Sequence, residues 1–163
     1  MTSLSITPLV AADLPFVREM LNEAAFWRGT TDAPSLDAAL GEAELAVYVE
    51  GWGRQGDDGL IARVGRRPVG AVWVRRFDDD VHGYGYVDEL TPELSIAVAQ
   101  EYRGRGIGRC LMAAMLVQLR LQGNGQVSLS VETDNPARLL YESLGFTRRQ
   151  TAEGAVTMVR TLS

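Results

Sequence analysis

Three glycines and three arginines lie close together in the ten-residue stretch EYRGRGIGRC, residues 101–110. The alternating run ELSIAVA, typical of a strand, precedes it, and the apolar run LMAAMLV follows it. The first turn of a helix carries free backbone N–H groups and the positive end of the helix dipole, and glycine lets an anion approach that backbone. Arginine adds charge-assisted donors. The stretch indicates a phosphate-binding turn, and a tight turn without a ligand is the alternative.

A dinucleotide site fits this turn poorly. Counted from Gly104, the last position of a G-x-G-x-x-G fingerprint is Arg109 and not glycine. Glu132 ends the next expected strand, where a ribose-binding acid would stand, but too little chain follows for the remaining parallel strands. The chain has no lysine, which excludes a Walker A phosphate loop.

Composition narrows the class of protein. A length of 163 residues suits one domain, residues 1–163. One cysteine and one histidine, His82, argue against a metal site, so no metal is expected. A net charge of −5 argues against a general nucleic-acid binder. The longest apolar run is too short to span a membrane and no secretory signal is visible, so a cytoplasmic location is expected.

The hydrophobic periodicity predicts a mixed α/β order, β-α-α-β-β-β-α-β-α-β. The expected strands are residues 4–9, 60–64, 69–77, 93–99, 127–131 and 155–162. The expected helices are a first one beginning near Asp13 and Pro15, and then residues 36–47 with Ser35 as N-cap, 106–122 and 136–144. In the third helix we expect an apolar stripe to face the core: Ile107, Leu111, Ala114, Val117 and Leu121.

Two motifs resemble the GNAT acyltransferase superfamily. The residues from Arg103 to Gly108 match its R-x-x-G-x-G/A loop at every fixed position, and NPARLLYESLGF, residues 135–146, resembles its N-x-x-x-x-x-Y-x-x-x-G-F segment. The resemblance is strong over residues 93–146 and weak over residues 26–60. It implies a GNAT fold: a mixed, mostly antiparallel sheet with a central splayed strand pair, flanked by helices.

The resemblance also implies a site for acetyl-CoA. Backbone groups of the strand would pair with the pantetheine arm, at Ile96, Ala97 and Val98. The pyrophosphate would be held by the turn, at Arg103, Gly104, Arg105, Gly106, Ile107, Gly108 and Arg109. Asn135 would touch the pantetheine or its thioester end, and Tyr141 would lie near the sulfur.

Acyl transfer to an amine requires a base, because only the neutral nitrogen can attack. Glu93 matches a glutamate that serves as base in part of the superfamily. Glu89, Asp88 and a water chain are the alternative bases. Glu93 could instead be a solvated carboxylate at the start of a strand, with no role in catalysis. A backbone N–H of residues 93–99 would stabilise the oxyanion, and Tyr141 would protonate the departing thiolate. Tyr141 could instead be a half-buried helix residue.

The expected function is therefore acetyl-CoA-dependent N-acetyltransfer to a primary amine of a small molecule or peptide, by direct attack in a ternary complex. The alternative is a catalytically silent domain that binds acyl-CoA as a sensor. The expected partner is the amine acceptor, with no nucleic acid and no membrane, and a homodimer is left open.

Overall fold

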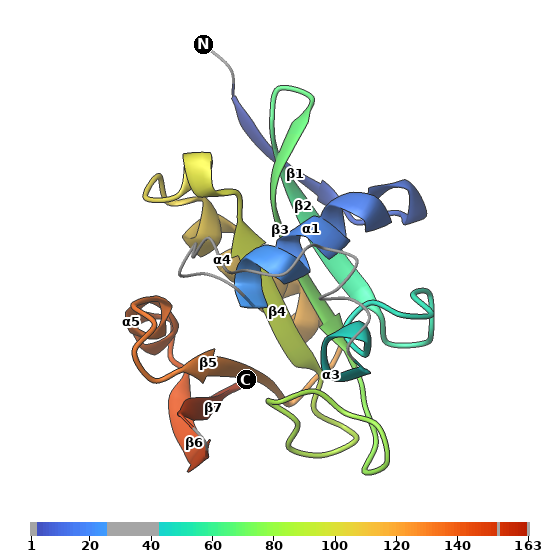
Figure 1. Cartoon of the computed structure of the whole chain (residues 1–163), viewed down its shortest axis with the longest axis vertical. Helices are drawn as coiled ribbons and strands as arrows, with labels where there is room; N and C mark the ends of the chain where they lie inside the picture. Colours follow the sequence, from blue (N-terminus) through green and yellow to red (C-terminus); the bar gives the residue numbers. More distant parts are fainter. Residues whose placement is uncertain (1–2, 26–42, 153, 163) are drawn as a thin grey trace.

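The computed structural model describes residues 3–25, 43–152 and 154–162. Its centre is a seven-stranded sheet in the order β1-β2-β3-β4-β5-β7-β6 (Figure 1). The strands are β1 Leu4–Pro8, β2 Asp58–Val64, β3 Arg67–Arg75, β4 Glu93–Val98, β5 Gln126–Glu132, β6 Thr147–Ala152 and β7 Ala155–Thr161. The α-helices are α1 Leu14–Ala25, α3 Ala43–Ala46, α4 Ile107–Leu121 and α5 Ala137–Ser143. Within these described ranges, no helix has the length and apolar character needed to cross a bilayer.

The sheet separates at its centre, between β4 and β5. Every other neighbouring pair is antiparallel, whereas β4 and β5 are parallel and share a registered pair, Glu93 with Ser128. Just before β4, the Pro92 carbonyl accepts a hydrogen bond of 3.0 Å from the Ser128 N–H. From this junction the two strands diverge (Figure 1). The prediction of a mostly antiparallel sheet with a splayed central pair is confirmed.

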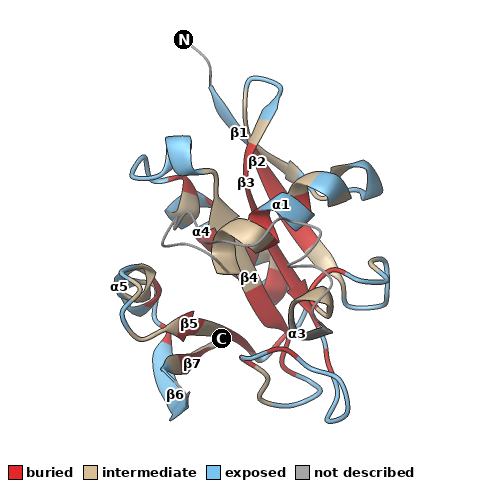
Figure 2. Ribbon diagram, in the orientation of Figure 1, coloured by how far each residue is buried: buried red, intermediate tan, exposed pale blue. Residues whose placement is uncertain are grey.

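Helices cover both faces of the sheet. α1 packs on β3 and β4 from one side and α4 packs on them from the other (Figure 1). Side chains of β3 alternate accordingly: Val72 and Val74 join the cluster beneath α4, and Trp73 joins the cluster beneath α1. The central strands are consequently the most buried part of the molecule (Figure 2).

The buried face of α4 differs from the predicted stripe. Ile107 and Leu111 are buried as expected, but Val117 is 48% exposed and Leu121 is 77% exposed. Core positions are taken instead by Met112, Met115, Leu116 and Leu119. Apolar residues occur around most of this helix, so periodicity alone could not select the face that packs on the sheet.

Two other expectations need correction or lie outside the described residues. The predicted order contained no strand between the last helix and residue 155, yet β6 lies there, and all of its residues, TRRQTA, are exposed. An edge strand with charged, solvated side chains carries no apolar alternation to detect. Of the helix expected over residues 36–47, the structure describes α3; Ser35 lies outside the described residues.

Candidate active site

A cleft of about 1160 Å³ opens where β4 and β5 diverge. Its walls come from both strands, from the glycine-rich turn before α4, and from α1 and α5. It brings together most of the residues predicted for the site: Glu93, Ile96, Ala97, Val98, Arg103, Gly104, Gly106, Ile107, Gly108, Arg109, Asn135 and Tyr141. Arg105 is not among the lining residues.

The β4 backbone offers hydrogen-bonding groups to this cleft. The Ala99 N–H donates to the Val69 carbonyl at 2.8 Å, and such bonds alternate along an antiparallel ladder. Ala97 therefore directs its backbone toward β3, whereas Ile96 and Val98 direct theirs toward the diverging side. The contact of the Val98 carbonyl with the Arg103 side chain agrees with this alternation. Ile96 and Val98, rather than Ala97, are thus placed to pair with an extended ligand.

The glycine-rich turn presents a row of free backbone donors. Gly104 and Gly106 have φ angles of 77° and 82°, in the left-handed region that side chains disfavour. In the described part of the chain, no hydrogen bond uses the N–H groups of residues 104–109. These donors lie at the N-terminus of α4, where the helix dipole favours negative charge. The turn has the donors that a diphosphate requires.

Arg103 and Arg109 are held by neighbouring elements. Arg103 donates from Nε to the Val98 carbonyl at 3.1 Å and pairs with Glu23 of α1 at 2.7 Å. Arg109 donates to the Ser143 hydroxyl of α5 at 3.1 Å. These contacts join the turn to the two helices that flank the cleft.

Arg105 and Asn135 also have structural partners. The Arg105 guanidinium lies over the Tyr102 ring, 4.9 Å from its centroid. The Asn135 side-chain oxygen accepts a hydrogen bond of 2.9 Å from the Ala137 N–H, at the start of α5. Asn135 thus binds the first N–H group of α5, and its amide NH₂ remains as a donor for a ligand.

Glu93 lies at the junction from which the strands diverge, and it is 3% exposed. The Tyr48 hydroxyl donates to its Oε2 at 2.6 Å. The same hydroxyl accepts a hydrogen bond of 2.7 Å from the Tyr84 N–H. The Oε1 atom of Glu93 is buried and forms no hydrogen bond with the described residues. One carboxyl oxygen is thus fixed by Tyr48, and the other is left for a proton.

Burial is the main cause that raises the pKa of Glu93, to about 7. The hydrogen bond from Tyr48, the nearby Gly85 amide and the His82 ring act in the opposite direction, because each favours the charged carboxylate. A carboxyl group with a pKa near neutrality can exchange a proton in either direction at physiological pH.

The two alternative bases lie apart from the cleft. Asp88 and Glu89 are exposed and do not line it. Asp88 accepts hydrogen bonds from the Leu90 N–H at 2.9 Å and from the Thr91 hydroxyl at 2.8 Å. It therefore organises the loop that precedes β4.

Tyr141 lies on α5 and lines the cleft. Burial raises the pKa of its hydroxyl to about 12, so the group stays protonated at neutral pH. The hydroxyl forms no hydrogen bond within the described part of the chain, although the ring packs near Phe146 with centroids 6.1 Å apart. It is available as a proton donor.

Sequence reasoning missed Tyr48. Tyr48 follows α3 and is 45 positions away from Glu93 in the chain. The one sequence signal was the pair of alternating glycines in HGYGY, which indicates close packing of this loop. In the structure, a Cβ atom at Gly83 would collide with the Tyr48 hydroxyl and the Glu93 carboxyl. A Cβ atom at Gly85 would come within 2.7 Å of the Leu129 backbone. These alternating glycines let the loop lie directly on the sheet.

The described ranges contain no group of three or more His, Cys, Asp or Glu side chains that could hold a metal ion.

Comparison with known proteins agrees with this geometry. The family model described as "Acetyltransferase (GNAT) domain" matches residues 55–148. A mycothiol acetyltransferase of Corynebacterium glutamicum is 39% identical over 74 residues, 42% of this chain and 25% of that protein. Another, of Thermobispora bispora, is 52% identical over 54 residues, 32% of this chain and 18% of that protein. The chain spans about a quarter or less of the length of these curated relatives.

Solved structures share the fold. The PaiA N-acetyltransferase of Thermoplasma acidophilum, in complex with coenzyme A, superposes with a TM-score of 0.73 at 18% identity, over 98% of this chain and 99% of that one. The ribosomal-protein-S18-alanine N-acetyltransferase of Escherichia coli gives a TM-score of 0.69 at 20% identity, over 99% and 95%. Because the family model covers more than half of the chain, the protein belongs to the acetyltransferase (GNAT) domain family.

Proposed function

We propose that the protein is an acetyl-CoA-dependent N-acetyltransferase that acetylates a primary amine of a small molecule or peptide by direct attack in a ternary complex. One observation carries the proposal. A cleft that presents free backbone N–H groups at a helix N-terminus also contains a buried carboxyl group, Glu93, with a pKa raised to about 7. The first feature suits a diphosphate and the second suits a base.

Acetyl-CoA would lie along the cleft. The N–H groups of residues 104–109 would bind the pyrophosphate. The backbone edge at Ile96 and Val98, which faces away from β3, would pair with the pantetheine arm as an added strand would. The bound cosubstrate supplies the acetyl group as a thioester. The sulfur would then lie toward Tyr141, and the thioester carbonyl oxygen would accept from a β4 N–H.

Glu93 and Tyr141 then divide the proton transfers. The amine nitrogen forms a bond to the acetyl carbon, and the carbon–sulfur bond breaks. Glu93 accepts the proton that the nitrogen loses, and the Tyr141 hydroxyl gives its proton to the leaving thiolate. Both residues return to their starting states by exchange with solvent. The scheme needs no metal and no covalent intermediate on the protein.

The acceptor would enter beside Glu93. This end of the cleft is lined by side chains of α1, of α3 and the turn after it, and of the loop before β4: Leu21, Ala24, Ala25, Leu45, Tyr48 and Tyr84. A largely apolar wall around a buried base favours a neutral amine over an ammonium ion. Because the curated relatives are named mycothiol acetyltransferases, the acceptor of those enzymes is one of the amines to be tested.

A thiol-release assay with acetyl-CoA and a panel of amines, peptides, aminoglycosides and the mycothiol acetyltransferase acceptor tests the proposal. Turnover that depends on both substrates, without acetylated protein in its mass spectrum, is the expected result. Tight CoA binding without turnover on any acceptor would favour the sensor. A thermal shift with a nicotinamide dinucleotide and none with CoA would overturn the proposal.

A further inference from the structure

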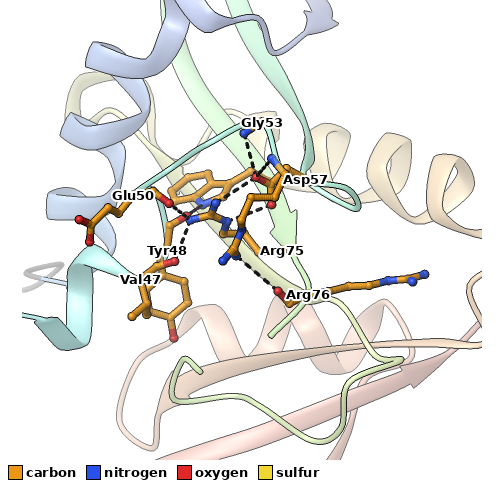
Figure 3. Close-up of polar contacts among 9 residues, drawn as sticks. Val47, Tyr48, Glu50, Gly53, Asp57, Arg75 and Arg76 are labelled. Atoms are coloured by element: carbon orange, nitrogen blue, oxygen red, sulfur yellow. Dashed lines mark hydrogen bonds and ion pairs between the residues drawn. The ribbon is translucent and has the colours of Figure 1, made fainter. Parts of the chain in front are cut away.

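Arg75, at the end of β3, forms a buried ion pair with Asp57, which immediately precedes β2 (Figure 3). The two side chains are 1% and 2% exposed. Nε and Nη2 of Arg75 each lie 3.0 Å from a different oxygen of Asp57, so the pair is bidentate. Asp57 also accepts from the N–H groups of Gly53 and Arg54. A fully buried pair whose polar atoms are satisfied keeps one geometry.

The third nitrogen of the Arg75 guanidinium, Nη1, binds the turn that follows α3. Nη1 donates to the Val47 carbonyl at 2.9 Å and to the Glu50 carbonyl at 2.6 Å (Figure 3). These two carbonyls lie on either side of Tyr48 in the chain. The carbonyl of Tyr48 itself accepts from the Trp73 indole N–H at 3.1 Å. The turn of residues 47–50 is thus attached to side chains of β3 at three points, one of them the Tyr48 carbonyl.

From this turn the Tyr48 side chain reaches the carboxyl of Glu93, 2.6 Å away. We propose that Tyr48 is a positioning residue for Glu93, and that the Arg75–Asp57 ion pair acts through Tyr48 by holding its turn in the one place from which the hydroxyl contacts the carboxyl. The inference rests on the proposed role of Glu93 as the base.

The surroundings of Glu93 determine the sign of the expected effect. The loop before β4 contributes the Gly85 amide and His82, both of which favour the charged carboxylate. Ser128 of β5 contributes a neutral hydroxyl, and α1 presents the apolar Leu21 to this end of the cleft. Arg75 is neutralised by Asp57. The Tyr48 hydroxyl is thus the main side-chain group that stabilises the carboxylate, and its loss should raise the pKa of Glu93.

Titration of the Glu93 carboxyl by NMR, with glutamate labelled at the side-chain carboxyl carbon, tests this without any turnover. Glu93→Gln identifies the signal. Tyr48→Phe should raise the pKa by about 1, because a hydrogen bond to a charged group is lost. Arg75→Lys keeps the charge but cannot reach Asp57 and both carbonyls, so it should raise the pKa in the same direction. The double variant should show no larger change than Tyr48→Phe alone, because both act through one contact.

Two matched controls separate this effect from general loosening. Tyr86→Phe removes a hydroxyl from the same loop region, one that binds Asp79, and Arg63→Lys alters the ion pair with Asp13; both should leave the pKa of Glu93 unchanged. If Arg75→Lys does not fold, Arg75→Gln combined with Asp57→Asn replaces it, since this pair leaves no buried charge unpaired. The proposal is overturned if Tyr48→Phe leaves the titration unchanged, if a folded Arg75 variant does so, or if the two effects add. Failure to find an acceptor leaves this test intact.

Discussion

Arg75 and Glu93 are direct partners in the β3–β4 ladder, yet the guanidinium of Arg75 pairs with Asp57 and not with Glu93. A cross-strand ion pair would stabilise the carboxylate and lower its pKa. Asp57 neutralises Arg75, and burial, the largest cause, raises the pKa of Glu93 to about 7. The buried ion pair thus leaves the neighbouring acid without Arg75 as a cationic partner, and its raised pKa is the one that the proposed base requires.

The first prediction concerns the pH dependence of acetyl transfer. The value of kcat/KM should fall as the pH drops below about 7, because Glu93 must be unprotonated to accept the amine proton. Glu93→Gln keeps the shape of the side chain and removes the base, so its plateau rate should be lower by about 10²–10⁴-fold. The pH dependence that remains in this variant should reflect deprotonation of the acceptor amine itself. Equal profiles for both proteins would show that Glu93 is not the base.

Stability should also depend on Glu93. Its pKa is raised from 4.5 to about 7 on folding, so its contribution is most favourable below pH 4.5 and is lost as the pH rises through about 7. Glu93→Gln lacks this titration. The variant should therefore gain about 2.5 kcal/mol of unfolding free energy relative to the wild type between about pH 5 and about pH 8. Denaturant unfolding at about pH 5 and about pH 8 measures this, with Glu89→Gln as a control that removes an exposed carboxyl.

Gly106→Asp should abolish most CoA binding, because it adds a side chain and a negative charge to the turn that presents the free donors. Gly123→Asp is the matched control: Gly106 and Gly123 flank α4, have φ angles of 82° and 89°, and have no atom within 4 Å of an added Cβ. Both variants carry similar backbone strain, so both should melt at similar temperatures. Calorimetric titration with CoA should then separate them. Equal affinities would mean that the glycines serve only the turn.

Tyr141→Phe should slow acetyl transfer while leaving CoA affinity nearly unchanged. The ring keeps its packing beside Phe146, and only the hydroxyl is lost. Positioned proton transfer typically contributes about 10²–10⁴-fold, and the loss is expected near the lower end because a thiol leaves readily. No alkaline decline should appear near neutrality, since the pKa of Tyr141 is about 12. A wild-type kcat in the variant would assign the residue to packing alone.

The glycine-rich turn and the strand before it were predictable from the sequence because their signals are local. Gly104 and Gly106 have positive φ angles, and in the sequence they stand between a strand pattern and a helix pattern, where such a turn is expected. Glu93 stands at the start of an alternating strand. The family motifs identified the fold, and the family model and solved structures confirm it. The individual site residues remain predictions, although most of them line one cleft.

The partner of Glu93 was not predictable in the same way. Tyr48 meets it through tertiary packing, and nothing in the local sequence of either residue specifies the contact. The same limit applies to Asp57 and Arg75, whose charges look like ordinary solvated residues until the fold buries them. The sequence did not predict β6, because a fully exposed edge strand carries no hydrophobic pattern by which to detect it.

The divergence of β4 and β5 has a consequence for selectivity. A sheet that opens at its middle has two unpaired inner edges, and unpaired edges normally invite another polypeptide to add a strand. Here α1 and α5 stand on either side of the opening. A ligand that pairs with these edges must lie between the two helices, where a polypeptide strand would have to place its side chains on alternating faces. We therefore expect the opening to favour a chain without bulky side chains, such as a pantetheine arm, over a polypeptide strand.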